Sequence, residues 1–226
     1  MGGRVSAEIG SPRFVGRDAE LRYVTHALNR LPALILIEGE AGMGKSRLVR
    51  EALASLGAKG PRPLVAVCPP LREALTLGPI VDAAWQAAPG VEALRGLGLS
   101  PLAGALRPLF PEWAAALPAA PPLLDDTGAA KHRLIRAFAE LLDRLRIEVL
   151  VVEDVHWADE ATLDLLGFLA RRIREIPVLL MVSYRNDELA DSHPLRISLG
   201  YLAVQRCARR LPRGRRRSRD CRGSDR

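Results

Sequence analysis

The chain has 226 residues, of which 48% are hydrophobic and 4% aromatic, and its formal net charge is +7. This length allows one α/β domain of ordinary size, and the hydrophobic fraction excludes a wholly disordered chain. The positive charge is confined to residues 206–226, which hold ten Arg and two Asp; the remaining 23 basic and 24 acidic residues exclude a broad basic surface on the folded body.

The predicted elements alternate between helices and apolar strands. In chain order they are a helix over 18–31, a strand over 33–38, a helix over 46–56, a strand over 63–68, short helices near 80–87 and 90–97, a helix over 131–146, a strand over 149–152, a helix over 160–173 and a strand over 178–183. Strands that alternate with helices predict a parallel sheet covered on both faces. Residues 79–128 are rich in Ala and Pro and are expected to form an irregular helical insertion.

Residues 39–46 read GEAGMGKS and match the phosphate-binding pattern G-x-x-x-x-G-K-[ST] in full. Glycines allow backbone N–H groups to surround a phosphate, and the following helix directs its positive dipole end at the same anion. The pattern predicts a P-loop NTPase three-layer sandwich that binds ATP, with Mg²⁺ on the Ser46 hydroxyl. The expected nucleotide contacts here are Gly39, Glu40, Ala41, Gly42, Met43, Gly44, Lys45, Ser46 and Arg47. The alternative is a glycine-rich turn that only joins a strand to a helix.

The strand over 149–152 leads into two carboxylates, Glu153 and Asp154. A P-loop enzyme needs one acid beside the metal and often a second one that polarises the attacking water. By position Glu153 is the metal-side acid and Asp154 the water-side acid. The usual order along the chain is Asp followed by Glu, so the two side-chain lengths are inverted here. The alternative is a solvated strand end. For Asp159 we expect the structural role, as the cap of the next helix.

Compartment signals are few. The three cysteines show no metal-ligand spacing, which indicates a reducing compartment, and Cys68 is expected in the core. The N-terminus carries no apolar signal segment, and no stretch reaches the ~18 uninterrupted apolar residues of a membrane helix. We therefore expect a cytoplasmic protein without a membrane partner.

Several motifs in order resemble the AAA+ ATPase module of the STAND class, found in large LuxR-type transcriptional regulators. They are Phe14-Val-Gly-Arg17, GEAGMGKS, VLVVEDVHWAD over 149–159, and Ser183-Tyr-Arg185. The resemblance implies that Val15, Gly16 and Arg17 contact the nucleotide, whereas the residues alone would make Arg17 a solvated helix-start residue. It also places Arg185 at a sensor position facing the γ-phosphate, as a catalytic residue beside Lys45 and Asp154; an exposed arginine in a turn is the equal alternative. For His156 and Trp157 we expect local packing.

The resemblance implies a nucleotide-switch module of a signalling regulator over residues 14–204, after a flexible segment over 1–13. It binds ATP or ADP, self-associates through this domain, and hydrolyses ATP to ADP and phosphate slowly if at all. Only a trace such as Arg210-Leu211-Pro212 echoes the family's last strand, and its lid is not recognisable. We therefore expect a truncated C-terminal part, an exposed apolar sheet edge and an Arg-rich disordered tail over 205–226. Specific DNA binding is not expected. The alternatives are a non-catalytic nucleotide-binding scaffold and a non-specific nucleic-acid binder that acts through the tail.

Overall fold

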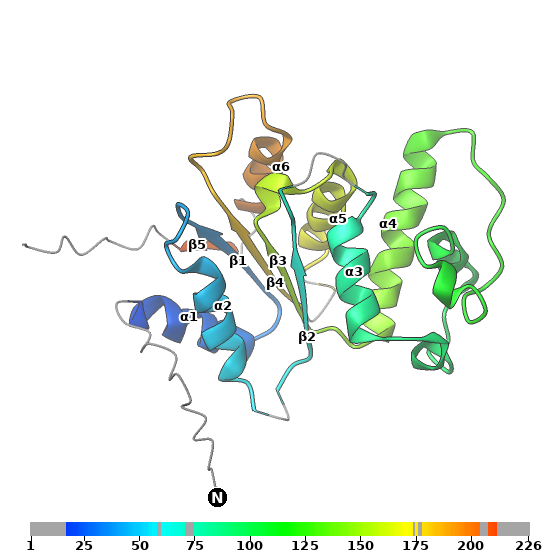
Figure 1. Ribbon diagram of the computed structural model, residues 1–226, viewed down its shortest axis with the longest axis horizontal. Coiled ribbons are helices and arrows are strands. Elements are labelled where there is room, and N and C mark those ends of the chain that lie inside the picture. The colour runs from blue at the N-terminus through cyan, green and yellow to red at the C-terminus, as the bar shows by residue number, and fades with distance from the viewer. Residues whose placement is uncertain are drawn as a thin grey trace, which may run out of the picture.

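The computed structural model describes residues 17–57, 60–70, 75–173, 175, 178–203 and 208–211. Five strands alternate with helices along this part of the chain (Figure 1). The strands are β1 Ala33–Glu38, β2 Pro63–Val67, β3 Val149–Glu153, β4 Leu179–Tyr184 and β5 Ala208–Leu211. The helices are α1 Asp18–Leu28, α2 Lys45–Ala54, α3 Gly78–Ala87, α4 Thr127–Arg144, α5 Glu160–Arg171 and α6 Pro194–Ala203, with the 3₁₀ turns η1 Val91–Leu94, η2 Pro101–Leu106, η3 Pro111–Trp113 and η4 Val155–Trp157.

The strands form one parallel sheet in the order β2-β3-β4-β1-β5. β1 and β4 pair along their whole length, from Ala33 opposite Leu179 to Glu38 opposite Tyr184. Because all strands run in the same direction, their carboxyl ends lie at one edge of the sheet. The predicted α/β P-loop NTPase fold is confirmed.

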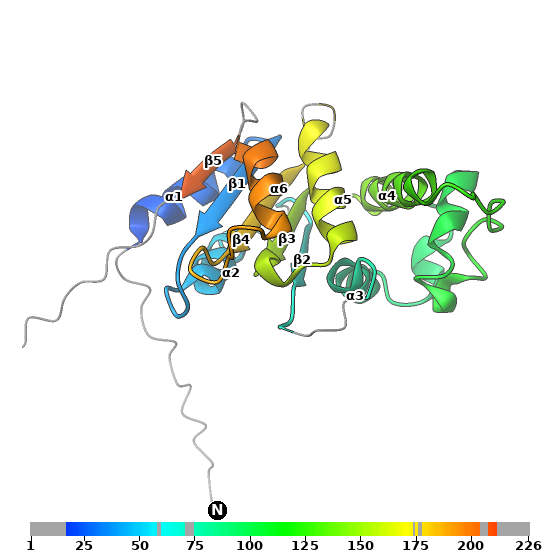
Figure 2. The ribbon, with the colours of Figure 1, turned by 90° about the horizontal axis from the view of Figure 1, so that it is seen from above.

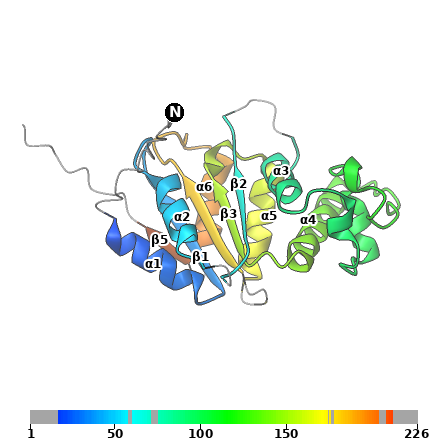
Figure 3. The same ribbon diagram turned by 60° about the horizontal axis from the view of Figure 1, so that its bottom comes forward.

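Alternate residues of the strands enter two separate cores, one on each face of the sheet. On one face, Ile35, Val151 and Met181 pack with α1 and α2. On the other face, Leu36, Val152 and Val182 pack with helices α3 to α6. Figure 3 shows α1 and α2 in front of the sheet and α6 behind it. Strands buried on both faces explain the near-continuous apolar runs in the sequence.

The expectation of a missing last strand and an entirely disordered tail is wrong for residues 208–211. These residues form β5 and pair with β1 from Leu34 opposite Ala208 to Ile37 opposite Leu211. The physical reason is that ladder hydrogen bonds come from the backbone, so an Arg-rich segment can satisfy the N–H and C=O groups of a buried strand. β5 covers the edge of β1 that we expected to be exposed. The rest of the tail lies outside the described residues, as does the segment over 1–13.

Residues 79–128 form a helical insertion whose short elements are α3 and the turns η1, η2 and η3. The turns η1 to η3 lie beyond α4 at the end of the molecule opposite α1 and β5, whereas α3 lies beside β2 (Figure 2). Trp113 is fully buried there and stacks on Phe110 with ring centroids 4.0 Å apart, and Phe110 meets Phe138 of α4 at 5.9 Å. The insertion therefore joins the core of one sheet face through aromatic contacts.

Among the described residues, no helix combines the length and the apolar character that crossing a membrane requires.

Candidate functional site

The loop over 39–44 connects β1 to α2 and lies at the carboxyl edge of the sheet. Gly42 and Gly44 have φ angles of +71° and +77°, in the left-handed region that favours glycine. A Cβ at either position would meet no atom within 4 Å, so the backbone conformation and not steric crowding is the reason for glycine here. Its first residue, Gly39, donates its N–H to the Tyr184 carbonyl of β4, which fixes the loop to the sheet. The sequence motif thus has the geometry of an anion cradle at the N-terminus of a helix.

Lys45 is the first residue of α2 and is 6% exposed. Its Nζ donates to the carbonyls of Gly39 and Glu40, at 2.9 and 3.1 Å, so the ammonium group closes the loop onto itself. Burial lowers the pKa of Lys45, while the nearby Asp154 acts in the opposite direction. Within the described residues, no carboxylate forms an ion pair with Lys45.

Arg17 precedes α1 and is 7% exposed, in contrast to the solvated residue that its position alone would suggest. Its Nη2 is buried without a hydrogen-bond partner among the described residues. The guanidinium lies close enough to Lys45 to lower the pKa of the lysine. Two buried cations therefore lie near each other at the start of α2. The neighbouring candidates Val15 and Gly16 lie outside the described residues.

The two acids after the apolar run of β3 lie in different environments. Glu153 ends the strand, is buried, and belongs by alternation to the sheet face that carries α2. Asp154 follows with a φ of +54° and is half-buried. Its N–H donates to Ser183 Oγ of β4 at 3.1 Å, which holds this strained turn. The two consecutive carboxylates therefore differ in exposure, Glu153 being buried and Asp154 half-buried.

Arg185 follows β4 and reaches across to the end of β3. Its Nε lies 3.8 Å from Asp154 Oδ1, and its Nη1 pairs with Glu188 Oε1. The second oxygen of Glu188 lies 3.2 Å from Nε2 of His156, a buried ring in η4. The structure therefore joins Arg185 to Asp154 and adds two groups to the cluster. The expected packing of Trp157 beside His156 is present, with ring centroids 5.3 Å apart, although Trp157 is half-exposed.

Two further expectations near this edge are confirmed. Asp159 caps α5, because its Oδ1 accepts from the N–H of Thr162 at 3.0 Å and its Oδ2 accepts from the Thr162 hydroxyl at 2.6 Å. The same Oδ1 accepts from the N–H of Leu77, just before α3. Cys68 is buried in the core, where burial and the nearby Asp159 and Asp154 raise the pKa of the thiol to about 12.

Comparison with known proteins places this geometry in a family. The sequence profile described as an AAA ATPase domain matches residues 13–182. The chain belongs to this family. An uncharacterised protein of Rhizobium meliloti (strain 1021) is 31% identical over 216 residues, a match that covers 84% of the AAA chain and 20% of that protein. The chain therefore spans about a fifth of this relative's length.

One solved structure, that of Orc1, supports the same fold, and two others are similar at lower TM-scores. Aeropyrum pernix Orc1, solved in complex with DNA, is 19% identical with a TM-score of 0.51, and the match covers 89% of the AAA chain and 46% of Orc1. Cdc6p of Pyrobaculum aerophilum has 15% identity, a TM-score of 0.49, and coverages of 91% and 47%. AMPPCP-bound DnaA of Aquifex aeolicus has 14% identity, a TM-score of 0.44, and coverages of 88% and 47%. At such identity the likeness to Orc1 concerns the fold alone.

The residues at the loop fit a magnesium–nucleotide pair better than a metal bound by protein alone. Within the part of the chain that the structure describes, no three His, Cys, Asp or Glu side chains gather as a metal cluster. Ser46 is exposed at the first turn of α2, and Glu153 is the acid on the same face. Mg²⁺ typically takes one or two protein oxygens and completes its shell with phosphates and water, which matches this sparse set.

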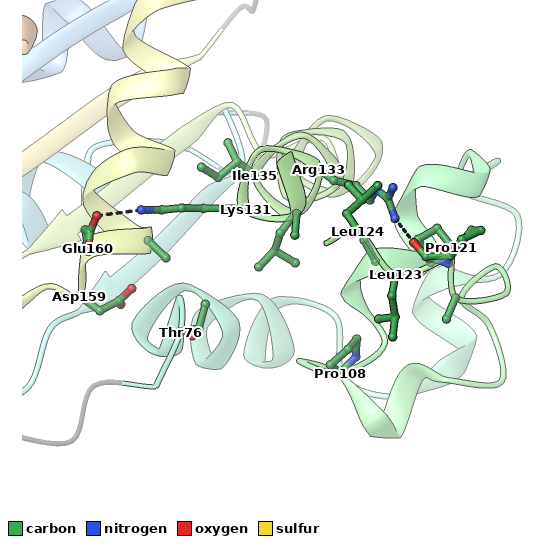
Figure 4. Close-up of a pocket in the computed structure, with 17 residues that line it drawn as sticks. Thr76, Pro108, Pro121, Leu123, Leu124, Lys131, Arg133, Ile135, Asp159 and Glu160 are labelled. Carbon is green, nitrogen blue, oxygen red and sulfur yellow. Dashed lines mark hydrogen bonds and ion pairs between the residues drawn. The ribbon is translucent and has the colours of Figure 1, made fainter. Parts of the chain in front are cut away.

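A separate cavity of about 600 Å³ lies between the insertion, α4 and the start of α5 (Figure 4). Its lining is mostly apolar, and Lys131 bridges to Glu160 at its α5 side. It contains no glycine loop of the phosphate-binding kind. The P-loop, rather than this cavity, is therefore the candidate nucleotide site.

Sequence reasoning missed Glu188, His156 and Ser183 as parts of the site. Ser183 and Arg185 belong to one quoted motif, but only the strand register shows that Ser183 holds the turn at Asp154. Glu188 follows Arg185 by three residues, and that spacing of opposite charges was the available signal.

Proposed function

We propose that this AAA domain binds ATP with Mg²⁺ as the nucleotide-switch module of a STAND-type signalling regulator. The observation that carries the proposal is the pair of buried cations, Arg17 and Lys45, at the N-terminus of α2. Neither is ion-paired to a carboxylate among the described residues, and Lys45 uses loop carbonyls instead. Burial of uncompensated charge is costly, and a bound anion removes that cost.

Binding requires Lys45 to exchange partners. Its Nζ leaves the carbonyls of Gly39 and Glu40 and pairs with phosphate oxygens, while the loop N–H groups and the helix dipole act on the same charge. The left-handed backbone at Gly42 and Gly44 turns the loop N–H groups toward the phosphates. Arg17 supplies a second positive charge beside Lys45. Val15 and Gly16, which precede it, stay expectations from the family resemblance.

Mg²⁺, held by Ser46 and Glu153, would neutralise charge that develops on the phosphates. If the domain hydrolyses ATP, Asp154 accepts a proton from the attacking water, whose oxygen forms a bond to the γ-phosphorus. The bond from that phosphorus to the β–γ bridging oxygen breaks, and ADP and phosphate leave. Lys45 and Arg185 are the cations nearest to this charge. A non-catalytic scaffold would bind the same nucleotide and release no phosphate.

The role as a regulator module rests on the order of the motifs, from Arg17 to Arg185. The match to a fifth of a much longer Rhizobium meliloti protein supports a module within a larger chain. We do not extend to this domain the DNA complex of Aeropyrum pernix Orc1, because at 19% identity that likeness concerns the fold. Self-association through the domain is part of the proposal, and AAA-type modules would use it to complete the site.

The test is a fluorescent-ATP titration of the wild type and the Lys45→Ala variant in Mg²⁺ buffer. We expect the variant to lose at least about 100-fold in affinity, because it removes a charge-assisted contact to the phosphates in a buried site. Lys131→Ala is the matched control, since it removes the same charge on α4 beside the distant cavity. Equal affinity of the Lys45 variant and the wild type would contradict the P-loop assignment.

A phosphate-release assay on the same samples separates a switch enzyme from a scaffold. Asp154→Asn is the informative variant because Asn tolerates the left-handed backbone at this position. We expect it to bind ATP like the wild type and to hydrolyse at least ~10-fold more slowly, in keeping with the loss of a proton acceptor. Equal phosphate release by the variant and the wild type would remove Asp154 from the mechanism.

A further inference from the structure

Four titratable or charged side chains form a chain of contacts at the carboxyl edge of the sheet. Asp154 lies 3.8 Å from Arg185, Arg185 pairs with Glu188, and Glu188 lies 3.2 Å from His156. The hydrolysis scheme accounts for Asp154 and Arg185. It does not account for Glu188, or for the burial of a histidine ring beside it.

His156 is held rigidly. Its side chain is 1% exposed, and its backbone carbonyl accepts a hydrogen bond from Nε2 of His193 at 3.1 Å. The His193 tautomer follows from the N–H of Leu195, which donates to His193 Nδ1 and leaves Nε2 as the donor. Yet neither ring nitrogen of His156 makes a hydrogen bond of good geometry among the described residues. A buried neutral imidazole in this state has an unsatisfied N–H, and its Nε2 lies 3.2 Å from the carboxylate of Glu188.

Glu188, in contrast, is on the loop after β4 and its side chain is 31% exposed. One of its oxygens holds the Arg185 guanidinium, and the other only approaches the ring. Arg185 is itself incompletely satisfied, because its Nε is buried without a hydrogen-bond partner. The carboxylate therefore has two competing partners, and the present arrangement favours the arginine.

We propose that Glu188 is a latch that exchanges partners: it holds Arg185 while the γ-phosphate position is empty and bonds to His156 when Arg185 turns to a bound γ-phosphate. The inference rests on the proposed nucleotide binding. ADP has no γ-phosphate, so Arg185 stays with Glu188 when ADP is bound. Only ATP binding opens the latch and offsets the cost of opening it, which makes Glu188 and His156 positioning residues for discrimination between the two nucleotides.

The latch predicts opposite effects for its two ends. Glu188→Gln removes the charge that holds Arg185, so the affinity for a non-hydrolysable ATP analogue rises about three- to tenfold, the range for one partly exposed ion pair. His156→Leu removes the second partner of Glu188, so the affinity for the analogue falls by a similar factor. The affinity for ADP stays within about twofold of the wild type in both variants. The double variant behaves like Glu188→Gln, because without the Glu188 carboxylate His156 has no partner to bind.

The experiment measures the affinities of mant-AMPPNP and mant-ADP for the wild type and the three variants, with circular dichroism to verify folding. Asp187→Asn is the control, because it removes the same charge from the same exposed loop. If that control raises AMPPNP affinity as much as Glu188→Gln, the effect is a general change of the electrostatic field and the latch is wrong. The Glu188 side chain is partly exposed, so its variant carries the test alone if His156→Leu fails to fold.

Other outcomes are equally decisive. A purely structural role would weaken both nucleotides together, which would overturn the latch. A Glu188→Gln variant whose AMPPNP-to-ADP affinity ratio equals that of the wild type would overturn it as well, while the proposed function would stand. If the wild type binds neither nucleotide, the proposed function fails first and the latch falls with it.

Discussion

The P-loop edge of the sheet and the helical insertion over 79–128 bury different kinds of side chain. The polar or charged residues that the structure buries lie just before α1, at the start of α2, near the ends of β3 and β4, in η4 and in the first turn of α5. They are Arg17, Lys45, Glu153, His156, Thr162 and Ser183. None of the described residues of this kind lies in the insertion, whose interior contains Trp113, Phe110 and leucines.

The two regions also differ in how their charged groups are satisfied. In the insertion, Arg107 donates to the carbonyls of Leu117 and Pro118, and Glu140 of α4 accepts twice from Ser100. Among the described residues, the buried nitrogen without a partner there is the neutral indole Nε1 of Trp113, whereas at the P-loop edge such nitrogens belong to Arg17, Arg185 and His156. The P-loop edge therefore carries ionisable groups whose partners a ligand can supply.

The largest effect that tests this comparison is on stability at Trp113. Trp113→Ala removes a fully buried ring that stacks on Phe110, so we expect the free energy of unfolding to fall by about 3–5 kcal/mol. The affinity of the folded fraction for ATP should not change, because the ring is far from the P-loop. Urea unfolding monitored by circular dichroism, with and without Mg-ATP, measures both quantities.

Trp157→Ala is the matched control on the site side. This tryptophan is 43% exposed, so its loss should cost about 1 kcal/mol or less. If both variants lose the same stability, the division between a stabilising insertion and a functional strand edge is wrong.

The sequence predicted the fold well where one physical cause dominates. Strands buried on both faces leave apolar runs, and each predicted strand agrees with β1 to β4 within one residue at either end. The P-loop was equally predictable because its glycines, lysine and serine are required by local geometry. β5 was missed because backbone pairing imposes little on the sequence of a strand. The 3₁₀ turns of the insertion were missed because runs of Pro and Ala show no hydrophobic periodicity.

Tertiary contacts explain what the sequence did not show at the site. His156 and Glu188 are separated by 32 positions, and only the pairing of β3 with β4 brings the loops that carry them together. Arg17 was undervalued for the same reason: its burial, at 7% exposure, is a tertiary property that its position before α1 does not show. Local pattern cannot reveal that a charged side chain is buried by a distant element.

A smaller effect concerns pH. Burial lowers the pKa of His156 below its usual 6.5, with Asp154 and Glu188 acting against this change and Arg185 and Lys45 adding to it. The unfolded chain therefore binds more protons than the folded one, and stability rises with pH. The contribution is fully present above about pH 6.5 and is lost as pH falls through the lower folded pKa. Each pH unit between the folded and unfolded pKa values corresponds to about 1.4 kcal/mol.

Comparing the unfolding free energies of the wild type and His156→Leu from pH 8 to 5 isolates the contribution of His156, because the other histidines titrate in both proteins. Parallel curves would show that the buried ring carries no such linkage.

The smallest effect is expected at Lys131, a lysine that pairs with two acids at the cavity side of the molecule. Lys131 on α4 pairs with Glu160 and Asp164 of α5, and hydrogen bonds from Lys131 to Asp164 and then Glu160 raise its pKa. The raised pKa would suggest a strong interaction, but the side chains are 34%, 79% and 46% exposed, so solvent screens the pair. Lys131→Ala should therefore lower the free energy of unfolding by about 0.5 kcal/mol or less, and 1 M NaCl should abolish the difference. A loss above ~1.5 kcal/mol that persists in salt would mean that this bridge is effectively buried. The cavity side of the molecule would then also hold a buried charge, a feature that we assign to the P-loop edge alone, and charge burial would no longer distinguish the two regions.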